Sequence, residues 1–162
     1  MYAPEEDFGE AYTRVGIWQA NASLQVPFKV GQQNLQYLAE WRMQHSKKPL
    51  TPQDRFSIGN RYTVRGYDGE QTLLADNGFL VRNELSGSIP KLPMQWYSGI
   101  DYGEVGGKTA HEPNPLVGTS LLGAVIGLRG QVFKSVSYDA FVGAPLKKPE
   151  YFKTDDFTTA LV

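Results

Sequence analysis

The feature that most constrains the fold is an alternation of apolar and polar residues that recurs in about seven segments of the chain. In the first segment, residues 18–28, apolar side chains occupy every second position and Gln, Asn and Ser fill most of the positions between them. The apolar residues are Trp18, Ala20, Ala22, Leu24, Val26 and Phe28. A repeat of two is the repeat of a β-strand whose two faces meet different surroundings. The sequence therefore predicts an all-β protein.

Residues 35–44 are compatible with two structures. Leu35, Leu38 and Trp41 recur every three residues, which suits a helix. Alternate positions of the same segment are also apolar, and this pattern is the more regular of the two. Those positions are Leu35, Tyr37, Ala39, Trp41 and Met43. The alternation favours a strand.

The connections between the predicted strands alternate between short and long. Short turns are expected at residues 29–34, at 90–93 and near Gly130, and long loops at 47–77, 104–115 and 145–153. Antiparallel transmembrane β-barrels have short turns on one side of the membrane and long loops on the other. The longest apolar run, residues 121–128, is shorter than the ~20 residues of a spanning helix but suits a spanning strand. The pattern predicts an antiparallel transmembrane β-barrel, with a soluble β-sandwich that acts as a binding module as the alternative.

A glycine-rich stretch, residues 56–85, has Val64, Arg65, Gly66 and Tyr67 at its centre. Further glycines at 59, 69 and 78 give the backbone several places to bend. Such a stretch can fold back on itself and present Arg65 at its tip. An ordinary surface hairpin loop, with no specific role for Arg65, is the simpler interpretation of these residues.

The whole stretch resembles the signature loop of two-partner secretion transporters, the TpsB or ShlB/FhaC/HecB haemolysin secretion/activation family. The family pattern is matched at residues 56–60, at Thr63 to Tyr67 and at Arg82-Asn83-Glu84-Leu85. Asn60 replaces a second glycine, and because asparagine also tolerates positive φ we expect the turn to survive. A second family motif, Gly-x-Asp-x-Gly, matches residues 99–103.

The resemblance implies that residues 1–162 are the C-terminal part of an outer-membrane barrel and supply about seven of its sixteen strands. Residues 47–77 would then be a long loop directed into the lumen. The implied function is a porin-like pore that exports a large secreted partner protein of the haemolysin or adhesin type, with no bond made or broken. The expected partners are that protein and outer-membrane lipid. A barrel-assembly protein of the same superfamily is an alternative, but the Arg-Asn-Glu-Leu and Thr-Val-Arg residues favour the exporter.

Two groups of residues are the candidate sites for this function. The first is the transport loop motif Val64, Arg65, Gly66 and Tyr67, and the second is the lumen motif Gly99, Asp101 and Gly103. Asp101 lies on the polar face of its predicted strand with small residues on either side, which leaves room for an approaching group. The resemblance implies that this group is Arg65. The alternative is that Asp101 is an ordinary polar residue of the wall.

Other functional classes have little support in the sequence. His45 and His111 are the only histidines, and neither has a second histidine at ligand spacing, so we expect no metal site. No nucleophile-elbow pattern is present, and no cofactor is expected. The net charge of −1 gives no sign of a nucleic-acid partner. By resemblance to family members that end in an aromatic residue, we expect the natural end to lie beyond Val162.

Overall fold

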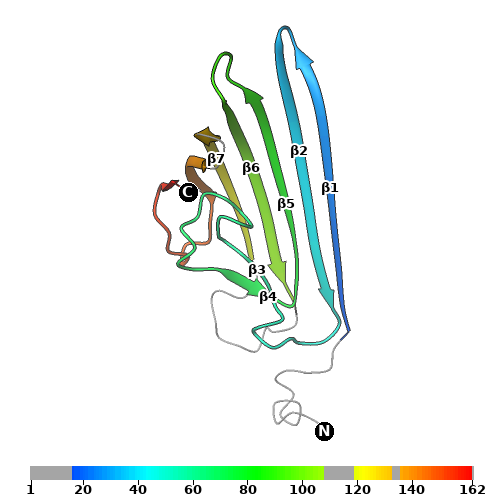
Figure 1. Ribbon diagram of the computed structural model, residues 1–162. Coiled ribbons are helices and arrows are strands. Elements are labelled where there is room, and N and C mark those ends of the chain that lie inside the picture. The colour runs from blue at the N-terminus through cyan, green and yellow to red at the C-terminus, as the bar shows by residue number, and fades with distance from the viewer. Residues whose placement is uncertain (1–15, 108–118, 133–135, 162) are drawn as a thin grey trace.

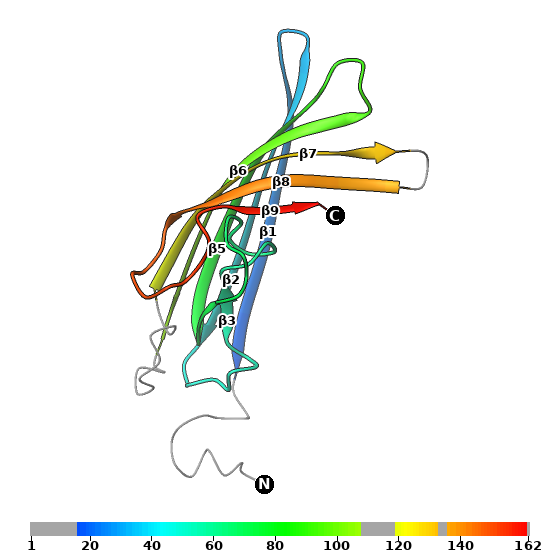
Figure 2. The same ribbon diagram turned by 90° about the vertical axis from the view of Figure 1, so that its left-hand side faces the viewer.

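The computed structural model describes residues 16–107, 119–132 and 136–161, and these residues form two antiparallel sheets. The larger sheet has seven strands in the order β1-β2-β5-β6-β7-β8-β9 (Figure 1 and, for β8 and β9, Figure 2). The smaller sheet pairs β3 with β4. The strands are β1 (Ile17–Val30), β2 (Gln33–Ser46), β3 (Phe56–Ile58), β4 (Leu73–Ala75), β5 (Asn77–Ser88), β6 (Met94–Gly106), β7 (Thr119–Val132), β8 (Val136–Lys147) and β9 (Thr158–Leu161).

The large sheet is a curved, open wall. In Figure 2, β7, β8 and β9 run in a different direction from β1 and β2, which shows how far the sheet bends. β1 and β9 lie at its two edges, and no pairing joins them within the part of the chain that the structure describes. The prediction of an all-β antiparallel sheet that forms part of a barrel is confirmed. Residues 35–44 lie in β2, so the strand interpretation is correct there and the helical one is wrong.

Short and long connections alternate as predicted, although several bounds differ from the expected ones. β6 continues to Gly106 and β7 passes Gly130 to end at Val132, so both strands are longer than predicted. The connection between β2 and β5 was expected to be a loop over residues 47–77, but it contains β3 and β4. Strands of three residues are too short to show a period-two pattern, which is why the sequence did not reveal them.

The two faces of the large sheet differ as the alternation predicted. The outer face carries exposed apolar side chains, including Trp18, Trp41, Ile100 and Ile126. Trp18 is 77% exposed and Ile126 is 63% exposed, so these side chains are not the core of a sandwich. The inner face carries buried residues such as Glu84 and Asp101. Within the described residues, no helix is both long and apolar enough to cross a membrane.

The apolar core lies between the inner face and the β2–β5 connection. Ile58, Leu73 and Ala75 contribute to it from β3 and β4, and each is fully buried. The wall contributes Leu80, Val105 and Leu121, and the β8–β9 connection contributes Phe152. The β2–β5 connection is therefore packed against the inside of the curved sheet, and this packing positions the Val64–Tyr67 tip.

Candidate functional site

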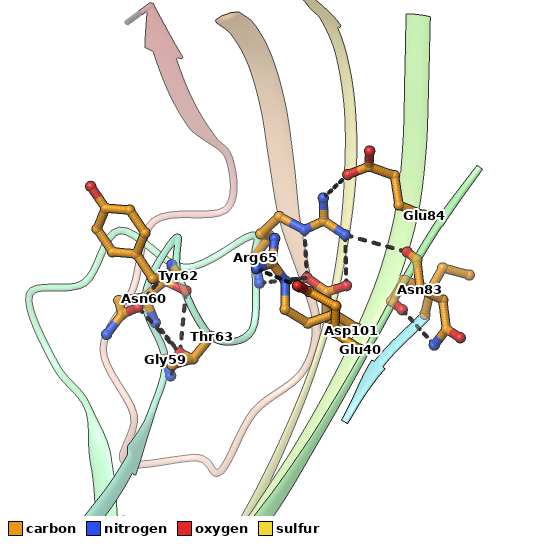
Figure 3. Close-up of polar contacts among 11 residues, drawn as sticks. Glu40, Gly59, Asn60, Tyr62, Thr63, Arg65, Asn83, Glu84 and Asp101 are labelled. Atoms are coloured by element: carbon orange, nitrogen blue, oxygen red, sulfur yellow. Dashed lines mark hydrogen bonds and ion pairs between the residues drawn. The ribbon is translucent and has the colours of Figure 1, made fainter. Parts of the chain in front are cut away.

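The turn before the tip is shaped by hydrogen bonds to Asn60 and Thr63. The Thr63 hydroxyl accepts hydrogen bonds from the backbone N–H groups of Gly59 and Asn60, at 3.1 and 3.2 Å. The Asn60 side chain accepts one from the N–H of Tyr62 at 2.9 Å (Figure 3). Asn60 does not have positive φ, so the expected reason for its tolerance was wrong. Its side chain closes the turn instead, while Gly59 takes the positive φ of 113°.

The tip reaches the wall because the wall is lined there with glycines. Gly66 has a φ of 103°, and a Cβ on it would lie 2.5 Å from the carbonyl oxygen of Ala144. From the wall side, a Cβ on Gly143 would lie 2.7 Å from the Cα of Gly66. A Cβ on Gly123 would overlap the carbonyl oxygen of Arg65, and one on Gly103 would lie 2.9 Å from the Val64 side chain. At Gly66, Gly123 and Gly143 the nearest atoms belong to the backbone, so only a residue without a side chain allows so close an approach there.

Arg65 and Asp101 are joined by three hydrogen bonds. The Arg65 Nε donates to Oδ2 of Asp101 at 2.6 Å, and Nη2 donates to Oδ1 at 2.8 Å. The backbone N–H of Arg65 also donates to Oδ2, at 3.0 Å. The two side chains are 8% and 1% exposed. A guanidinium that grips both oxygens of a carboxylate is a strong and geometrically specific pair. The contact between Arg65 and Asp101 that the resemblance implied is thus present in the structure.

A second carboxylate completes the surroundings of Arg65. Glu84 of β5 accepts a hydrogen bond from Nη1 of Arg65 at 2.6 Å, and its other oxygen lies 2.8 Å from Nη2 of Arg129. The carbonyl oxygen of Asn83 lies 3.3 Å from Nη2 of Arg65 (Figure 3). Glu84 was recognised in the sequence only as part of the Arg-Asn-Glu-Leu motif. Its position on the same strand face as Arg82 was the signal that it also points inward.

Arg65 is held in its charged form. Burial by itself would lower the pKa of Arg65, but the hydrogen bonds and negative charge of Asp101, and then of Glu84, outweigh it and raise the pKa above its ordinary value. The tip therefore carries a permanent positive charge between two carboxylates. Such a group can lock a loop to a wall, but it cannot act as an acid or a base near neutral pH.

Tyr67 anchors the tip at a β-bulge in the wall. Its hydroxyl lies 2.6 Å from the carbonyl oxygen of Lys147 and 3.0 Å from that of Leu122. The β7–β8 pairing shifts register between Leu122 and Gly123, which leaves these carbonyls for the Tyr67 hydroxyl. Burial raises the pKa of Tyr67 to about 12, while the bond to Leu122 acts to lower it. Tyr67 therefore stays protonated and remains a donor.

The β8–β9 connection, residues 148–157, clasps the other side of the loop. Phe152 packs edge-on against Tyr67, with ring centroids 5.7 Å apart. Asp68 accepts hydrogen bonds from the Thr154 hydroxyl and the Asp155 N–H, both at 3.0 Å. Burial acts to raise the pKa of Asp68, but these bonds and one from the Glu70 N–H outweigh it and lower the pKa. We refer to residues 148–157 as the clasp.

The structure brings the predicted site residues together. Val64, Arg65, Gly66 and Tyr67 all contact the inner face, and Arg65 lies against Gly99 and Asp101. A Cβ on Gly99 would lie 2.5 Å from Nη2 of Arg65. Sequence reasoning missed the roles of Gly123, Gly143 and the clasp, since these contacts join distant parts of the chain.

The two histidines give no sign of a metal site in the described residues. His45 is exposed, and His111 lies outside the described residues. No cluster of His, Asp or Glu in the described ranges is suited to a metal ion.

Comparisons with known proteins agree with this architecture. The family model described as haemolysin secretion/activation protein ShlB/FhaC/HecB matches residues 3–130. Outer membrane transporter CdiB-2 from Burkholderia pseudomallei strain 1026b is 40% identical over 157 residues, which is 95% of this chain and 26% of that protein. The solved structure of CdiB from Escherichia coli has a TM-score of 0.81 and 27% sequence identity. That match covers 93% of this chain and 27% of the solved chain.

The chain thus spans about a quarter of the length of the relatives that it matches. The family match covers well over half of the chain. The chain therefore belongs to the ShlB/FhaC/HecB family of haemolysin secretion/activation proteins, which are proteins of the bacterial outer membrane.

Proposed function

We propose that residues 1–162 are the C-terminal part of an outer-membrane barrel that exports a large secreted partner protein of the haemolysin or adhesin type. The exposed apolar face of the sheet contacts lipid, and the inner face lines the lumen. This assignment follows from the distribution of side chains, because polar groups in the bilayer core find no water to satisfy them. Export requires passage rather than bond chemistry, so the residues of interest are those that govern the lumen.

The loop that carries Arg65 holds the barrel in the conformation from which transport begins. The observation that supports this most strongly is the buried pair of Arg65 and Asp101, which joins a loop to the wall through the side-chain bonds and the backbone N–H. A loop that only decorated the surface would not need an arginine buried between Asp101 and Glu84. The loop fills space on the lumen side, so its position determines what can pass.

The strength of the lock suits a loop with two positions. A fully exposed pair contributes only ~0–1 kcal/mol, while removing one partner of a desolvated pair costs ~3–5 kcal/mol because the other charge is left unpaired. Because the Arg65 and Asp101 side chains are 8% and 1% exposed, the pair lies nearer the desolvated limit. That is enough to shift a loop from one position to another, but too little to unfold a barrel.

A double-mutant cycle tests this function in the full-length transporter. Arg65→Ala, Asp101→Ala and the double variant are compared for the amount of partner protein secreted, with heat-resistant gel mobility as the control for barrel insertion. We expect Arg65→Ala to impair export with insertion largely intact, and the double variant to lose much less than the sum of the two single losses. Purely additive losses would show that the two residues act separately, and the lock would have to be abandoned.

A further inference from the structure

Arg82 of β5 lies beside the lock without being part of it. Its Nε lies 3.8 Å from Oδ2 of Asp101, beyond hydrogen-bond distance. This Nε is buried, and no group among the described residues accepts a hydrogen bond from it. The opposite end of the guanidinium is held, because Nη1 lies 3.2 Å from Oε2 of Glu40. A buried donor without an acceptor is costly, so its persistence needs a physical reason.

The register of the sheet explains why Arg82 points at Asp101. Glu40 pairs with Arg82 across β2 and β5, and Arg82 pairs with Asp101 across β5 and β6. The three side chains therefore stand in one row on the inner face, with alternating charge. In this row, Oδ2 of Asp101 already accepts two hydrogen bonds from Arg65, one from the side-chain Nε–H and one from the backbone N–H. Arg65 thus occupies the oxygen that Arg82 faces.

Glu84 shows the same arrangement two residues further along β5. One of its oxygens is taken by Arg65, and the other lies 2.8 Å from Arg129 of β7. Each carboxylate that Arg65 grips therefore has a second arginine, from the wall, within 4 Å. Glu84 already has its second ion pair, with Arg129. The Nε of Arg82 would have to move less than 1 Å closer to Asp101 to reach a normal N–H···O distance of ~2.9 Å.

We propose that Arg82 is the alternative partner of Asp101, and that it closes onto this carboxylate when the loop tip withdraws. Arg82 is then a positioning residue that acts through Asp101. This inference rests on the proposed movement of the loop. Withdrawal of Arg65 would otherwise leave the Asp101 carboxylate without the cation that holds it in the docked state. With Arg82 in place, Asp101 exchanges one arginine for another and Glu84 keeps Arg129, so no carboxylate of the lock is left without a cation.

The exchange predicts that Arg82 favours the withdrawn state of the loop. Arg82 is short of a hydrogen bond to Asp101 while the loop is docked and forms one once the loop leaves. Removing Arg82 should therefore make withdrawal rarer, although the ion pairs of Arg82 in the described residues are with Glu40 and Asp101 of the wall and not with the loop motif. A purely structural arginine would have the opposite effect, because its loss would loosen the wall and the docked loop together.

The first test measures loop withdrawal directly in the full-length transporter, in a cysteine-free background. Val64 is fully buried and this chain has no cysteine, so Val64→Cys reports withdrawal through its rate of labelling by a water-soluble maleimide. Arg82→Met should slow the labelling roughly tenfold, which corresponds to about 1.4 kcal/mol. Arg82→Lys keeps the charge and should slow it less. Arg42→Met is the matched control, since it removes an inward arginine of β2 that pairs with neither carboxylate of the lock in the described residues.

The second test uses heat stability and needs no secreted partner. In the Arg65→Ala background, Arg82→Met should lower the temperature at which the barrel loses its folded gel mobility by more than it does when Arg65 is present. Asp101→Asn should remove that additional loss, because it removes the unpaired charge. Arg82→Gln provides the same comparison if Arg82→Met does not assemble.

Unchanged or faster labelling in Arg82→Met, or an equal loss of heat stability with and without Arg65, would overturn the exchange. Neither measurement depends on export. If Arg65→Ala leaves secretion intact while both Arg82 results hold, the exchange stands and only the proposed role in export is lost.

Discussion

At the scale of single residues, the site depends as much on glycines as on charged side chains. Arg65 can reach Asp101 only because Gly66 has a positive φ and because the wall offers Gly123 and Gly143 where the tip passes. The motif Val-Arg-Gly-Tyr can be recognised in the sequence, but Gly123 and Gly143 look like ordinary small residues of a strand. Their role appears only once β7 and β8 are placed beside the tip.

Gly123→Ala should prevent the tip from docking. The added methyl group would overlap the carbonyl oxygen of Arg65, which is backbone and cannot rotate away. Forcing a methyl group into such a contact costs ~1–3 kcal/mol, so we expect faster maleimide labelling of Val64→Cys. Gly106→Ala is the control, because a Cβ there has no atom within 4 Å. Equal labelling in both variants would show that the tip does not rest on Gly123.

At the scale of elements, the loop is held from two sides. The wall strands β5 and β6 hold Arg65 through Glu84 and Asp101, and the clasp holds Tyr67 and Asp68 through Phe152 and Thr154. The core between β3, β4 and the wall adds apolar contact. The loop tip is therefore fixed by three separate groups of contacts, and its release requires the clasp to yield as well as the ion pairs.

The clasp should weaken in acid. Because the folded pKa of Asp68 lies below its ordinary value of 3.8, its ionised form stabilises the clasp above that pH, and this stabilisation is lost as the pH falls through the lower folded pKa. We expect hydrogen-exchange protection of the Asp155 amide to hold above pH 3.8 and to fall below it. The Lys153 amide bonds to the neutral Gln71 and is the internal control. Asp68→Asn should abolish the difference in pH dependence between the two amides. If the protection of the Asp155 amide does not change with pH, the charge of Asp68 has no role in the clasp.

How far the sequence predicts this structure depends on the range of each contact. Alternation in residues 18–28 and 35–44 specifies strands and their faces, because the pattern is local and repeats over many residues. The partnership of Arg65 and Asp101 came from the resemblance to a family. The clasp was not predicted, since Asp68 and Thr154 are 86 residues apart and neither stands in a recognisable motif. The exchange partner Arg82 needed the register of β5 and β6.

At the scale of the whole molecule, the seven strands form a wall with two different sides. One side is apolar and exposed, and the other carries the charges and the docked loop. β1 and β9 remain as free edges in the described sheet, where further strands of the full-length barrel would pair. The wall therefore fits the proposed role of one section of a closed barrel that separates lipid from an aqueous lumen.

Cysteine labelling of the assembled barrel tests this two-sided arrangement. Ile126 and Ala124 lie on the outer face of β7, and Ser137 lies on the inner face of β8 opposite Gln131. Cysteines at positions 124 and 126 should react with lipid-phase probes, and a cysteine at 137 with aqueous ones. Equal aqueous labelling at all three positions would indicate a soluble fold.

A reversible covalent bond between the loop and the wall tests directly whether the loop must move for export. A Cβ on Gly103 would lie 2.9 Å from the Val64 side chain, so the pair Val64→Cys and Gly103→Cys can form a disulfide that ties the tip to β6. Secretion of the partner protein is measured in the full-length transporter with this bond oxidised and then reduced, with each single-cysteine variant as a control. We expect oxidation to stop secretion and reduction to restore it. Undiminished secretion through a fully oxidised barrel would show that the loop need not leave the wall, and the lock would then have no part in export.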